Sequence, residues 1–348
     1  MSTDCSQIKS ALTHLLDLRN QFAEAYSRVD ESLGRHDPAN QQAMESSETK
    51  MKEIKEAIQE LENLLPISLE QAQEIMEADG YHGFLGPEAI KQAFGMELSS
   101  KEIPPINFTK EQLERAKDLG QFLVLRLDRI KDNQGEFQPL NVANLVEISS
   151  GRNIKLRNQD DWLATTQGPR EKGVVAIKDQ TPQPGWSLVS SELVPGTKNK
   201  NYLEQTEIII DYLKSKIYPG QELFQPYEEA LKEFEQIKKA RPNLAELTVS
   251  QEESEWKLAA KILGNLKITK LLRRTPIEIL YDLYVFKDRY GKYLLSGPNY
   301  DWSSGRHFDD RLAFLGSFDS RGVDTRDGMP GYSYGIPGVS VSRRSFPA

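Results

Sequence analysis

The C-terminal segment of the chain, residues 296–348, reads SGPNYDWSSGRHFDDRLAFLGSFDSRGVDTRDGMPGYSYGIPGVSVSRRSFPA. After Lys292 the chain contains no Lys, Glu or Gln, although these residues are frequent before it. Gly, Ser, Tyr, Asp and Arg alternate here with short apolar pairs, and binding surfaces favour such side chains because their contacts cost little conformational entropy. The segment therefore predicts a binding surface. The alternative is an irregular, glycine-rich β cap that binds no ligand.

The bulk composition is typical of globular proteins. The chain has 348 residues, 38% hydrophobic and 28% charged, which leaves room for two or three domains with a sizeable core. Its formal net charge of −8 argues against a broad surface that follows nucleic-acid phosphates. Cys5 is the single cysteine, which excludes an internal disulfide framework. The histidines are scattered (His14, His36, His82 and His307), which argues against a His/Cys metal site.

The sequence shows no membrane span and no export signal. No apolar run reaches the roughly 18 residues that a transmembrane helix requires. The N-terminal residues MSTDCSQIKS lack the basic-then-apolar order of a signal peptide. We therefore expect a cytoplasmic protein by default, and leave open surface display or secretion by an unrecognised route.

Residues 1–66 predict an N-terminal antiparallel helical hairpin. Apolar residues recur at helical spacing in two series: Ile8, Leu12, Leu15, Phe22, Tyr26, Val29 and Leu33, then Met44, Met51, Ile54, Ile58, Leu61 and Leu65. Between them, Gly34 can end the first helix, Asp37 can cap the second, and Pro38 fits its first turn. Two amphipathic helices over about residues 6–65 leave an apolar seam, which either packs on the same chain or joins copies into a homo-oligomer.

Residues 67–118 predict a small helical subdomain. Capping boxes begin at Ser68 and at Thr109, and a further short helix is expected between Pro87 and Gly95. His82 lies among these helices, and we interpret it as a packed or exposed ring because no second donor lies at metal-ligand spacing.

Residues 119–348 predict a mixed α+β body. Buried or alternating apolar patterns predict strands at residues 122–127, 173–177, 186–194, 279–286, 292–295, 312–318 and 339–343. Helical periodicity predicts helices at residues 139–148, 202–217, 227–237 and 254–272. Residues 319–338 are expected to form an exposed loop, because they are polar and rich in Gly and Pro.

The chain lacks the common motifs of enzymes and metal sites. It contains no phosphate-binding glycine loop, no G-x-S-x-G, no H-E-x-x-H and no Cys–His pair suited to nucleophilic catalysis. The spacing of Asp319, Asp324 and Asp327 does not fit an alternating calcium-loop pattern, and Arg321 and Arg326 are interleaved. We therefore predict no metal and no cofactor.

One cluster offers an enzymatic alternative. His307 with Asp309 and Asp310 could serve as a general acid–base group in a hydrolase-like enzyme or enzyme subunit. We favour a surface cluster with ordinary acid–base behaviour, since nothing in the sequence indicates that these side chains are desolvated.

The C-terminal residues resemble a known protein family. The runs Tyr300–Arg306 (YDWSSGR), 311–320 (RLAFLGSFDS) and 338–344 (GVSVSRR) are similar to the variable proteins of diversity-generating retroelements. The resemblance covers about residues 275–348, and the body from residue 119 more weakly. It implies a C-type-lectin fold of the formylglycine-generating-enzyme branch, with a variable region at about residues 299–344. The active-site cysteine of those enzymes has no counterpart at this end of the chain, so their activity is not implied.

The resemblance also implies which positions vary. Adenine-directed mutagenesis of Asn-type codons yields Tyr, Asp, Ser, Gly, Arg and His but never Lys, Glu or Gln, as in this segment. The implied scaffold positions are Trp302, Leu312, Phe314, Gly316, Phe318, Gly322, Val339 and Val341. The implied ligand-facing positions are Ser303, His307, Phe308, Asp309, Ser317, Arg321, Asp324, Arg326, Asp327, Met329, Tyr332, Ser333 and Tyr334.

These observations favour a non-enzymatic binding protein. We expect a fold of the α+β class, in which an N-terminal helical hairpin precedes a C-type-lectin-like body with a variable C-terminal surface. The expected partner is an unidentified protein or cell-surface ligand, not nucleic acid. The alternatives are the hydrolase-like enzyme above and a structural protein assembled through the N-terminal helices.

Overall fold

A computed structural model describes residues 5–30, 38–64, 67–131, 135–150, 155–157, 176–240, 243–307, 309–333, 335 and 337–344. The chain has the mixed α+β composition predicted for it. The described residues divide into two compact units. One holds the residues up to Ala72 together with Pro105–Leu113, and the other holds Gln73–Pro104 and the residues from Glu114 onward.

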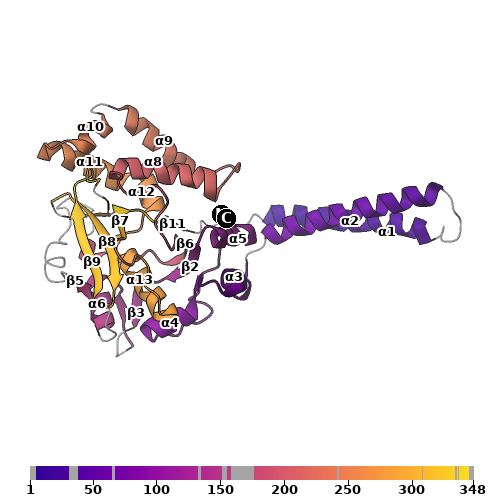
Figure 1. The fold of residues 1–348 in the computed structure, drawn as a ribbon. Helices are drawn as coiled ribbons and strands as arrows, with labels where there is room; N and C mark the ends of the chain where they lie inside the picture. The colour runs from indigo at the N-terminus through magenta and orange to yellow at the C-terminus, as the bar shows by residue number, and fades with distance from the viewer. Residues whose placement is uncertain are drawn as a thin grey trace. The chain divides into compact units, whose positions relative to one another are not determined.

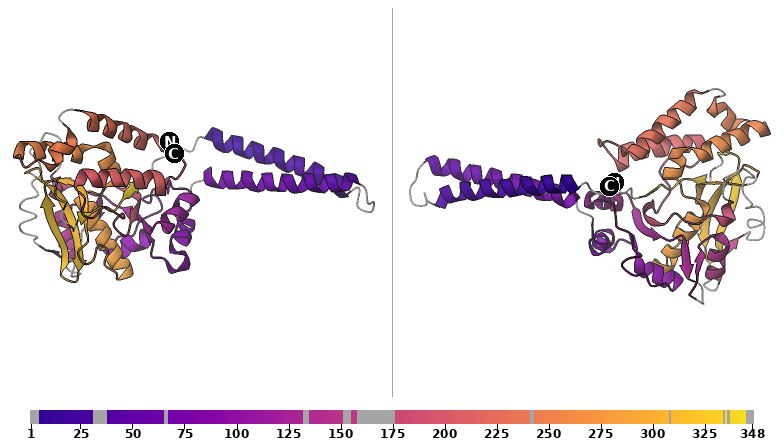
Figure 2. Two further views of the ribbon diagram at one scale, coloured as in Figure 1. Left: turned by 45° about the horizontal axis from the view of Figure 1, so that its top comes forward. Right: turned by 180° about the vertical axis from the view of Figure 1, so that it is seen from behind.

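The first unit is built on two long helices, α1 (Cys5–Asp30) and α2 (Pro38–Leu64). They lie side by side in both ribbon views (Figures 1 and 2). Leu18 of α1 and Ala57 of α2 are buried, although neither belongs to the predicted apolar series. Four members of that series, Leu12, Met44, Met51 and Ile58, are exposed, so the predicted seam is wrong at these positions.

The second unit contains a four-stranded sheet in the order β1-β2-β6-β11. Its strands are β1 (Phe84–Leu85), β2 (Gln121–Arg126), β6 (Gly185–Ser190) and β11 (Ser342–Arg344). β1 is parallel to β2, while β6 runs antiparallel to both β2 and β11. Every residue of β2 is buried, which confirms the apolar strand predicted there.

The second unit also contains a five-stranded sheet in the order β10-β7-β8-β9-β5. Its strands are β10 (Pro337–Gly338), β7 (Tyr300–Arg306), β8 (Leu312–Asp319), β9 (Gly322–Gly328) and β5 (Leu156–Arg157). β7, β8 and β9 pair antiparallel, and the outer strands β10 and β5 pair parallel with β7 and β9. A separate two-stranded ladder joins β3 (Arg129–Lys131) and β4 (Phe137–Pro139).

Helix α13 (Pro276–Tyr290) contacts strands of both larger sheets. Residues 279–286, predicted as a strand, are part of this helix, so that prediction is wrong. The helix begins with a capping box between Thr275 and Glu278 and ends at Gly291 in the left-handed conformation. All residues from Pro276 to Phe286 are buried, and a helix that is buried on every side loses the polar face by which the sequence would reveal it.

Four further strand and loop predictions are wrong in whole or in part. Residues 292–295 form no strand and instead pass through a turn after α13. Residues 319–338 are not a continuous loop, because β9 lies within them and pairs along β8. The strand predicted at residues 339–343 is confined to Ser342–Arg344. Of the strand predicted at residues 173–177, the first three residues lie outside the described ones and Ile177 begins a 3-10 turn.

Most of the remaining helices lie where the sequence predicts them, but the helix at Leu244–Val249 was not predicted. The helix predicted at residues 254–272 is two helices, which Leu266 separates. The remaining helices are α3 (Leu69–Glu77), α4 (Pro87–Phe94), α5 (Lys110–Asp118), α6 (Val142–Ser150), α8 (Tyr202–Tyr212), α9 (Gln225–Lys239), α10 (Leu244–Val249), α11 (Glu253–Asn265) and α12 (Lys267–Leu272). Helices α8 to α12 group together beside the β7–β9 strands (Figure 1). Of the helices that the structure describes, none combines the length and apolar character that a membrane span needs.

Candidate functional site

One face of the five-stranded sheet gathers aromatic and charged side chains. Tyr300 on β7 lies in register with Gly316 on β8 and Asp324 on β9, and the register continues through Trp302, Phe314 and Arg326. Side chains two positions apart along a strand share one face. We call the set formed by Tyr300, Phe314, Ser317, Asp324, Arg326 and Tyr332 the aromatic–arginine face.

Polar contacts on this face centre on Asp324. Its Oδ2 accepts hydrogen bonds from the Tyr300 hydroxyl at 2.5 Å and from Arg326 Nε at 3.0 Å. The Arg326 guanidinium also lies over the Tyr300 ring, 5.1 Å from its centre. Burial, and then the Asp324 carboxylate, raise the pKa of Tyr300 above its ordinary value, so the hydroxyl stays protonated and donates. Asp324 thus holds Arg326 at the edge of the face.

Aromatic rings form the floor of the face. Phe314 lies 5.7 Å from Tyr300 and 5.9 Å from Trp302, ring centre to ring centre. Tyr332 stacks on Phe314 at 6.2 Å with an interplanar angle of 17°. Trp302 is fully buried, whereas Tyr332 is half-buried. A packed aromatic layer therefore supports the partly exposed ring of Tyr332.

The segment that carries Tyr332 is anchored to the neighbouring helices. The Pro330 carbonyl accepts a hydrogen bond from the Tyr202 amide at the start of α8. A Cβ at Gly331 would lie 2.4 Å from the Thr248 carbonyl oxygen of α10, so the backbone can pass there only without a side chain. The position of Tyr332 is thus fixed by backbone contacts.

Two ion-pair clusters flank this face. Arg311 pairs with Asp309 at 3.5 Å and with Asp327 at 3.4 Å, and both carboxylates remain partly exposed. At the β8–β9 turn, Asp319 accepts from Arg321 at 2.8 Å and pairs with Arg157 at 3.1 Å. The hydrogen bonds from Arg321 lower the pKa of Asp319 to about 2. The charged side chains of these two clusters are therefore aspartates and arginines that pair with one another.

The predicted ligand-facing positions that the structure describes differ in their exposure to solvent. The exposed ones are Arg321, Arg326, Asp327 and Ser333, and the half-buried ones are Asp309, Ser317, Met329 and Tyr332. Phe308 and Tyr334 lie outside the described residues. The buried ones are Ser303, His307 and Asp324, which corrects the expectation that their side chains face solvent.

Each buried position has a physical reason for its placement. The Ser303 hydroxyl donates to the Ala313 carbonyl at 2.7 Å and accepts from the Gly305 amide at 3.1 Å, so it stabilises a bulge between β7 and β8. His307 is held by a backbone hydrogen bond from its amide to the Arg311 carbonyl and is only 1% exposed. Asp324 is enclosed by Tyr300 and Arg326.

Each aspartate of the acid–base cluster around His307, and each aspartate considered for a calcium site, pairs with an arginine. Asp310 pairs with Arg306, and Asp309 pairs with Arg311. Of the aspartates considered for calcium, Asp319 pairs with Arg321, Asp324 with Arg326, and Asp327 with Arg311. Among the described residues, no group of three or more His, Cys, Asp or Glu side chains could hold a metal ion.

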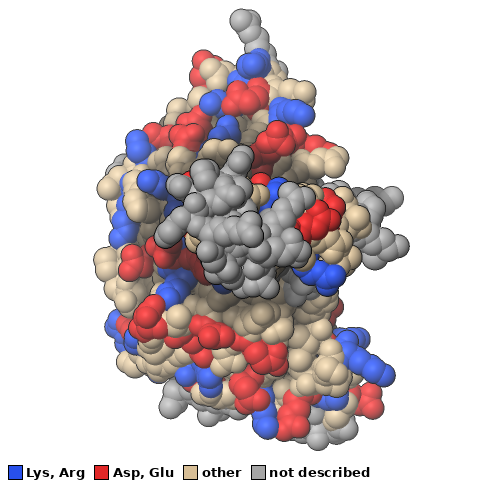
Figure 3. Space-filling view, turned by 90° about the vertical axis from the view of Figure 1, so that its right-hand side faces the viewer, with Lys and Arg blue, Asp and Glu red and all other residues tan. Residues whose placement is uncertain are grey.

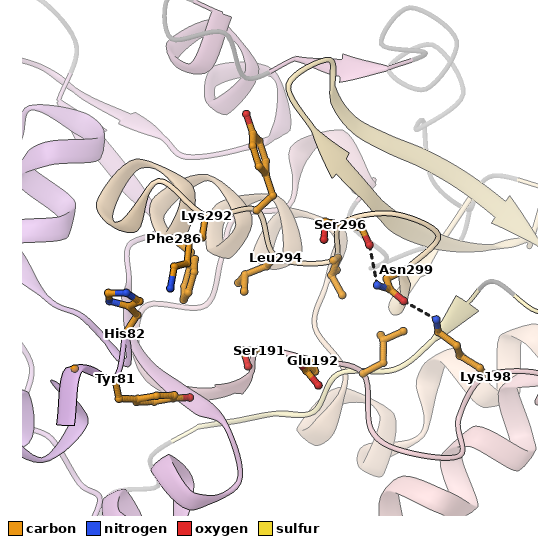
Figure 4. A pocket seen from close by; sticks show the side chains of 14 residues that line it. Tyr81, His82, Ser191, Glu192, Lys198, Phe286, Lys292, Leu294, Ser296 and Asn299 are labelled. Carbon is orange, nitrogen blue, oxygen red and sulfur yellow. Dashed lines mark hydrogen bonds between the residues drawn. The ribbon is translucent and has the colours of Figure 1, made fainter. Parts of the chain in front are cut away.

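A pocket of about 710 Å³ adjoins the start of β7 (Figure 4). His82 and Tyr81 line one part of it, Ser191 and Glu192 another, and Lys198 a third. In Figure 4, Asn299 joins the pocket to the C-terminal segment, since its side chain accepts from Lys198 Nζ at 2.5 Å and donates to the Ser296 carbonyl at 2.7 Å. The His82 ring is exposed and packs 4.6 Å from that of Tyr290.

Sequence reasoning did not find the buried ionic network beneath β7. Arg126 on β2 pairs with Asp282 at 2.5 Å, and Arg274 joins Asp282 at 2.8 Å to Asp301 on β7 at 2.9 Å. Glu278 adds a further carboxylate, 3.4 Å from Arg126. The sequence signal that could have indicated this network is a pair of acidic residues, Glu278 and Asp282, which lie one helical turn apart within an apolar run.

Comparison with protein-family models, with curated proteins and with solved structures gives no match.

Proposed function

We propose that the chain is a non-enzymatic binding protein whose C-terminal surface is diversified by a retroelement. The observation that carries the proposal is that the implied scaffold positions are buried while four of the implied ligand-facing positions are exposed. All of the implied scaffold positions are buried: Trp302, Leu312, Phe314, Gly316, Phe318, Gly322, Val339 and Val341. Arg321, Arg326, Asp327 and Ser333 are exposed, although they alternate with those positions in the sequence.

This division is what a diversified surface requires physically. Substitution of an exposed side chain without core contacts changes the stability of a protein by only about 0.5 kcal/mol. The buried positions carry the packing, and the close backbone approaches at Gly316 and Gly322 fix how the strands pass one another. Polar neighbours can then differ while the framework stays folded.

The proposed fold is C-type-lectin-like. In support of it, β11, the last described strand, returns to the sheet of the early strands β2 and β6. Val341 is buried beside it, and its carbonyl accepts a hydrogen bond from the Ser190 amide. The C-terminal segment is thereby connected to the strands that open the body.

The aromatic–arginine face suits a protein or cell-surface ligand better than a polyanion. Arg326 and Tyr332 are residue types that concentrate binding energy in interfaces. Arg311, Arg321 and Arg326 are each paired with an aspartate, so this surface offers both signs of charge. On another face of the molecule, basic and acidic side chains are also interspersed (Figure 3).

The N-terminal helices are proposed to join copies of the chain. Met44, Met51 and Ile58 repeat every seven residues along α2 and are 54%, 41% and 40% exposed. Leu12 and Leu16 of α1 are 43% and 52% exposed. Heptad-spaced apolar side chains outside the α1–α2 seam are typical of a second helix-packing surface.

The DNA next to the coding sequence tests the diversification proposal. We expect a near-copy of the bases encoding residues 299–344, differing from it mainly where the copy has adenines, beside a gene for a reverse transcriptase. The absence of either from the genome would overturn diversification, and only the proposal of a binding surface would then remain.

A further inference from the structure

A second cavity, of about 380 Å³, lies at the far end of β7 from Tyr300. It is lined by Ser304, Gly305 and Arg306 of β7, by Thr275 at the start of α13, and by Arg344 of β11. The end of α11, helix α12 and the segment before β6 complete it with Gly264, Asn265, Lys270, Gln180 and Gln183.

The charged side chains that line this cavity are all basic. Lys270, Arg306 and Arg344 line it, and no acidic side chain is among the described residues that do so. Asp310 pairs with Arg306, and Glu278 pairs with Arg344 at 3.0 Å, but neither carboxylate lines the cavity. Lys270 is exposed and makes no ion pair within the described part of the chain.

The two arginines are held in place before any ligand arrives. Arg306 is 7% exposed, and the Arg344 side chain is 30% exposed against the almost fully buried Glu278. Burial lowers the pKa of Arg344, because its charge is poorly solvated where it lies. A bound anion would return part of the lost solvation, and two fixed guanidinium groups present planar donor pairs suited to oxyanions.

The cavity keeps room for a ligand because backbone forms part of its wall. Gly264 and Gly305 contribute no side chain. A Cβ at Gly305 would lie 2.5 Å from the Pro276 ring, so the close packing of β7 on the start of α13 depends on this glycine. The Thr275 hydroxyl already accepts the capping hydrogen bond of α13. A ligand would therefore be bound by Lys270, Arg306, Arg344 and the neutral polar side chains of the wall.

We propose that this cavity binds a small oxyanion, a ligand that carries a phosphate group or carboxylates. Its volume lies within the range of roughly 300–1,000 Å³ that small-molecule sites occupy. The pocket in Figure 4 differs, because Glu192 stands among its lysines Lys198 and Lys292. The oxyanion site is separate from the aromatic–arginine face and does not depend on diversification.

Calorimetric titration of the full chain at constant ionic strength tests the proposal, with pyrophosphate in one arm and succinate in the other. We expect at least one of them to bind with a dissociation constant of about 1 mM or tighter. Binding of pyrophosphate alone identifies a phosphate ligand, and binding of succinate identifies a carboxylate ligand. No binding in either arm would overturn the proposal.

Two exposed lining residues locate the site without disturbing the core. Lys270→Gln removes one cation and should weaken binding roughly tenfold or more. Asn265→Glu adds a negative charge to the wall and should weaken it at least as much. The matched control is Lys267→Gln on the same helix, where the side chain pairs with Glu229 and does not line the cavity. Unchanged affinity in both lining variants, or an equal loss in the control, would show that the anion binds elsewhere.

Discussion

Arg274 binds Asp301 through two donors, Nε at 3.2 Å and Nη2 at 2.9 Å, and so ties the start of α13 to β7. Both side chains are buried. The Ser340 amide and hydroxyl also donate to Asp301, at 2.8 and 2.9 Å. Because Ser340 lies just before β11, the same carboxylate also holds the segment that leads into this strand. One carboxylate therefore organises the framework under the aromatic–arginine face.

Loss of the Asp301 carboxylate should be strongly destabilising. Asp301→Ala leaves the buried Arg274 with the Asp282 carboxylate and the Ser340 hydroxyl as partners, and removing one member of a buried ion pair costs about 3–5 kcal/mol. Urea unfolding followed by circular dichroism measures the change. As a control, Asp327→Ala removes an exposed partner of Arg311 and should cost no more than about 1 kcal/mol. Equal losses in the two variants would contradict the organising role of Asp301.

Acid should weaken the fold partly through Glu278. Burial raises the pKa of this carboxyl, but Arg126 and Arg344 outweigh burial and leave the pKa below its ordinary value. A depressed folded-state pKa gives stability that is present above the unfolded value of about 4.3 and is lost as the pH falls through the folded value below it. The free energy of unfolding of Glu278→Gln should therefore fall less steeply than that of the wild type below about pH 5. Parallel pH profiles would exclude Glu278 as a source of the acid sensitivity.

Backbone proximity should make Gly316 irreplaceable. A Cβ at this position would lie 2.0 Å from the Asn299 carbonyl oxygen. Gly316→Ala must therefore push β7 and β8 apart, and we expect a loss of about 2 kcal/mol or more in unfolding free energy. Gly328→Ala is the matched control, since its nearest neighbour is a Phe314 side-chain atom at 3.4 Å. Equal melting temperatures of the two variants would show that the close approach of Gly316 to the Asn299 carbonyl does not affect stability.

Side chains on the proposed binding surface should be replaceable. Asp327→Ser and Ser333→Tyr alter exposed positions, and each should change the unfolding free energy by less than about 1 kcal/mol. Phe314→Ser, in the buried aromatic layer, should cost about 3 kcal/mol or more. Thermal melting of the three variants gives the comparison. Unfolding of both surface variants would mean that this surface is part of the core.

The exposed stripe on α2 should control the oligomeric state. Light scattering after size-exclusion chromatography should give a mass above that of one chain for the wild type, and the mass of one chain for the triple variant Met44→Gln, Met51→Gln, Ile58→Gln. Lys52→Gln, with a side chain 80% exposed, is the control and should leave the wild-type mass unchanged. A monomeric wild type would dismiss assembly through these helices.

The sequence predicted those elements in which local pattern and burial agree. β2 and β8 are apolar runs buried in sheets, and the predicted capping boxes at Ser68 and Thr109 form at the starts of α3 and α5. α13 was misread because burial on all sides erased its helical period, although Thr275 and Glu278 carried a readable capping pattern. Tertiary context there outweighed the β propensity of Tyr, Val and Phe.

The polar strand β9 could not be predicted from its own residues. Within GVDTRDG only Val323 is apolar, and the strand forms because β8 supplies its backbone partners. Asp324 is buried for a similar reason, since the Tyr300 hydroxyl that donates to it comes from another strand, β7. The ionic network joins Arg126 to Asp282, residues far apart in the sequence, and no local pattern reports such a pair.

Sequencing of the bases encoding residues 299–344 in many cells of one lineage tests the central claim most directly. We predict that substitutions gather at surface positions such as Arg321, Arg326, Asp327 and Ser333, and that Trp302, Phe314, Gly316 and Phe318 stay constant. An invariant segment, or substitutions spread equally over buried and exposed positions, would contradict a diversified recognition surface.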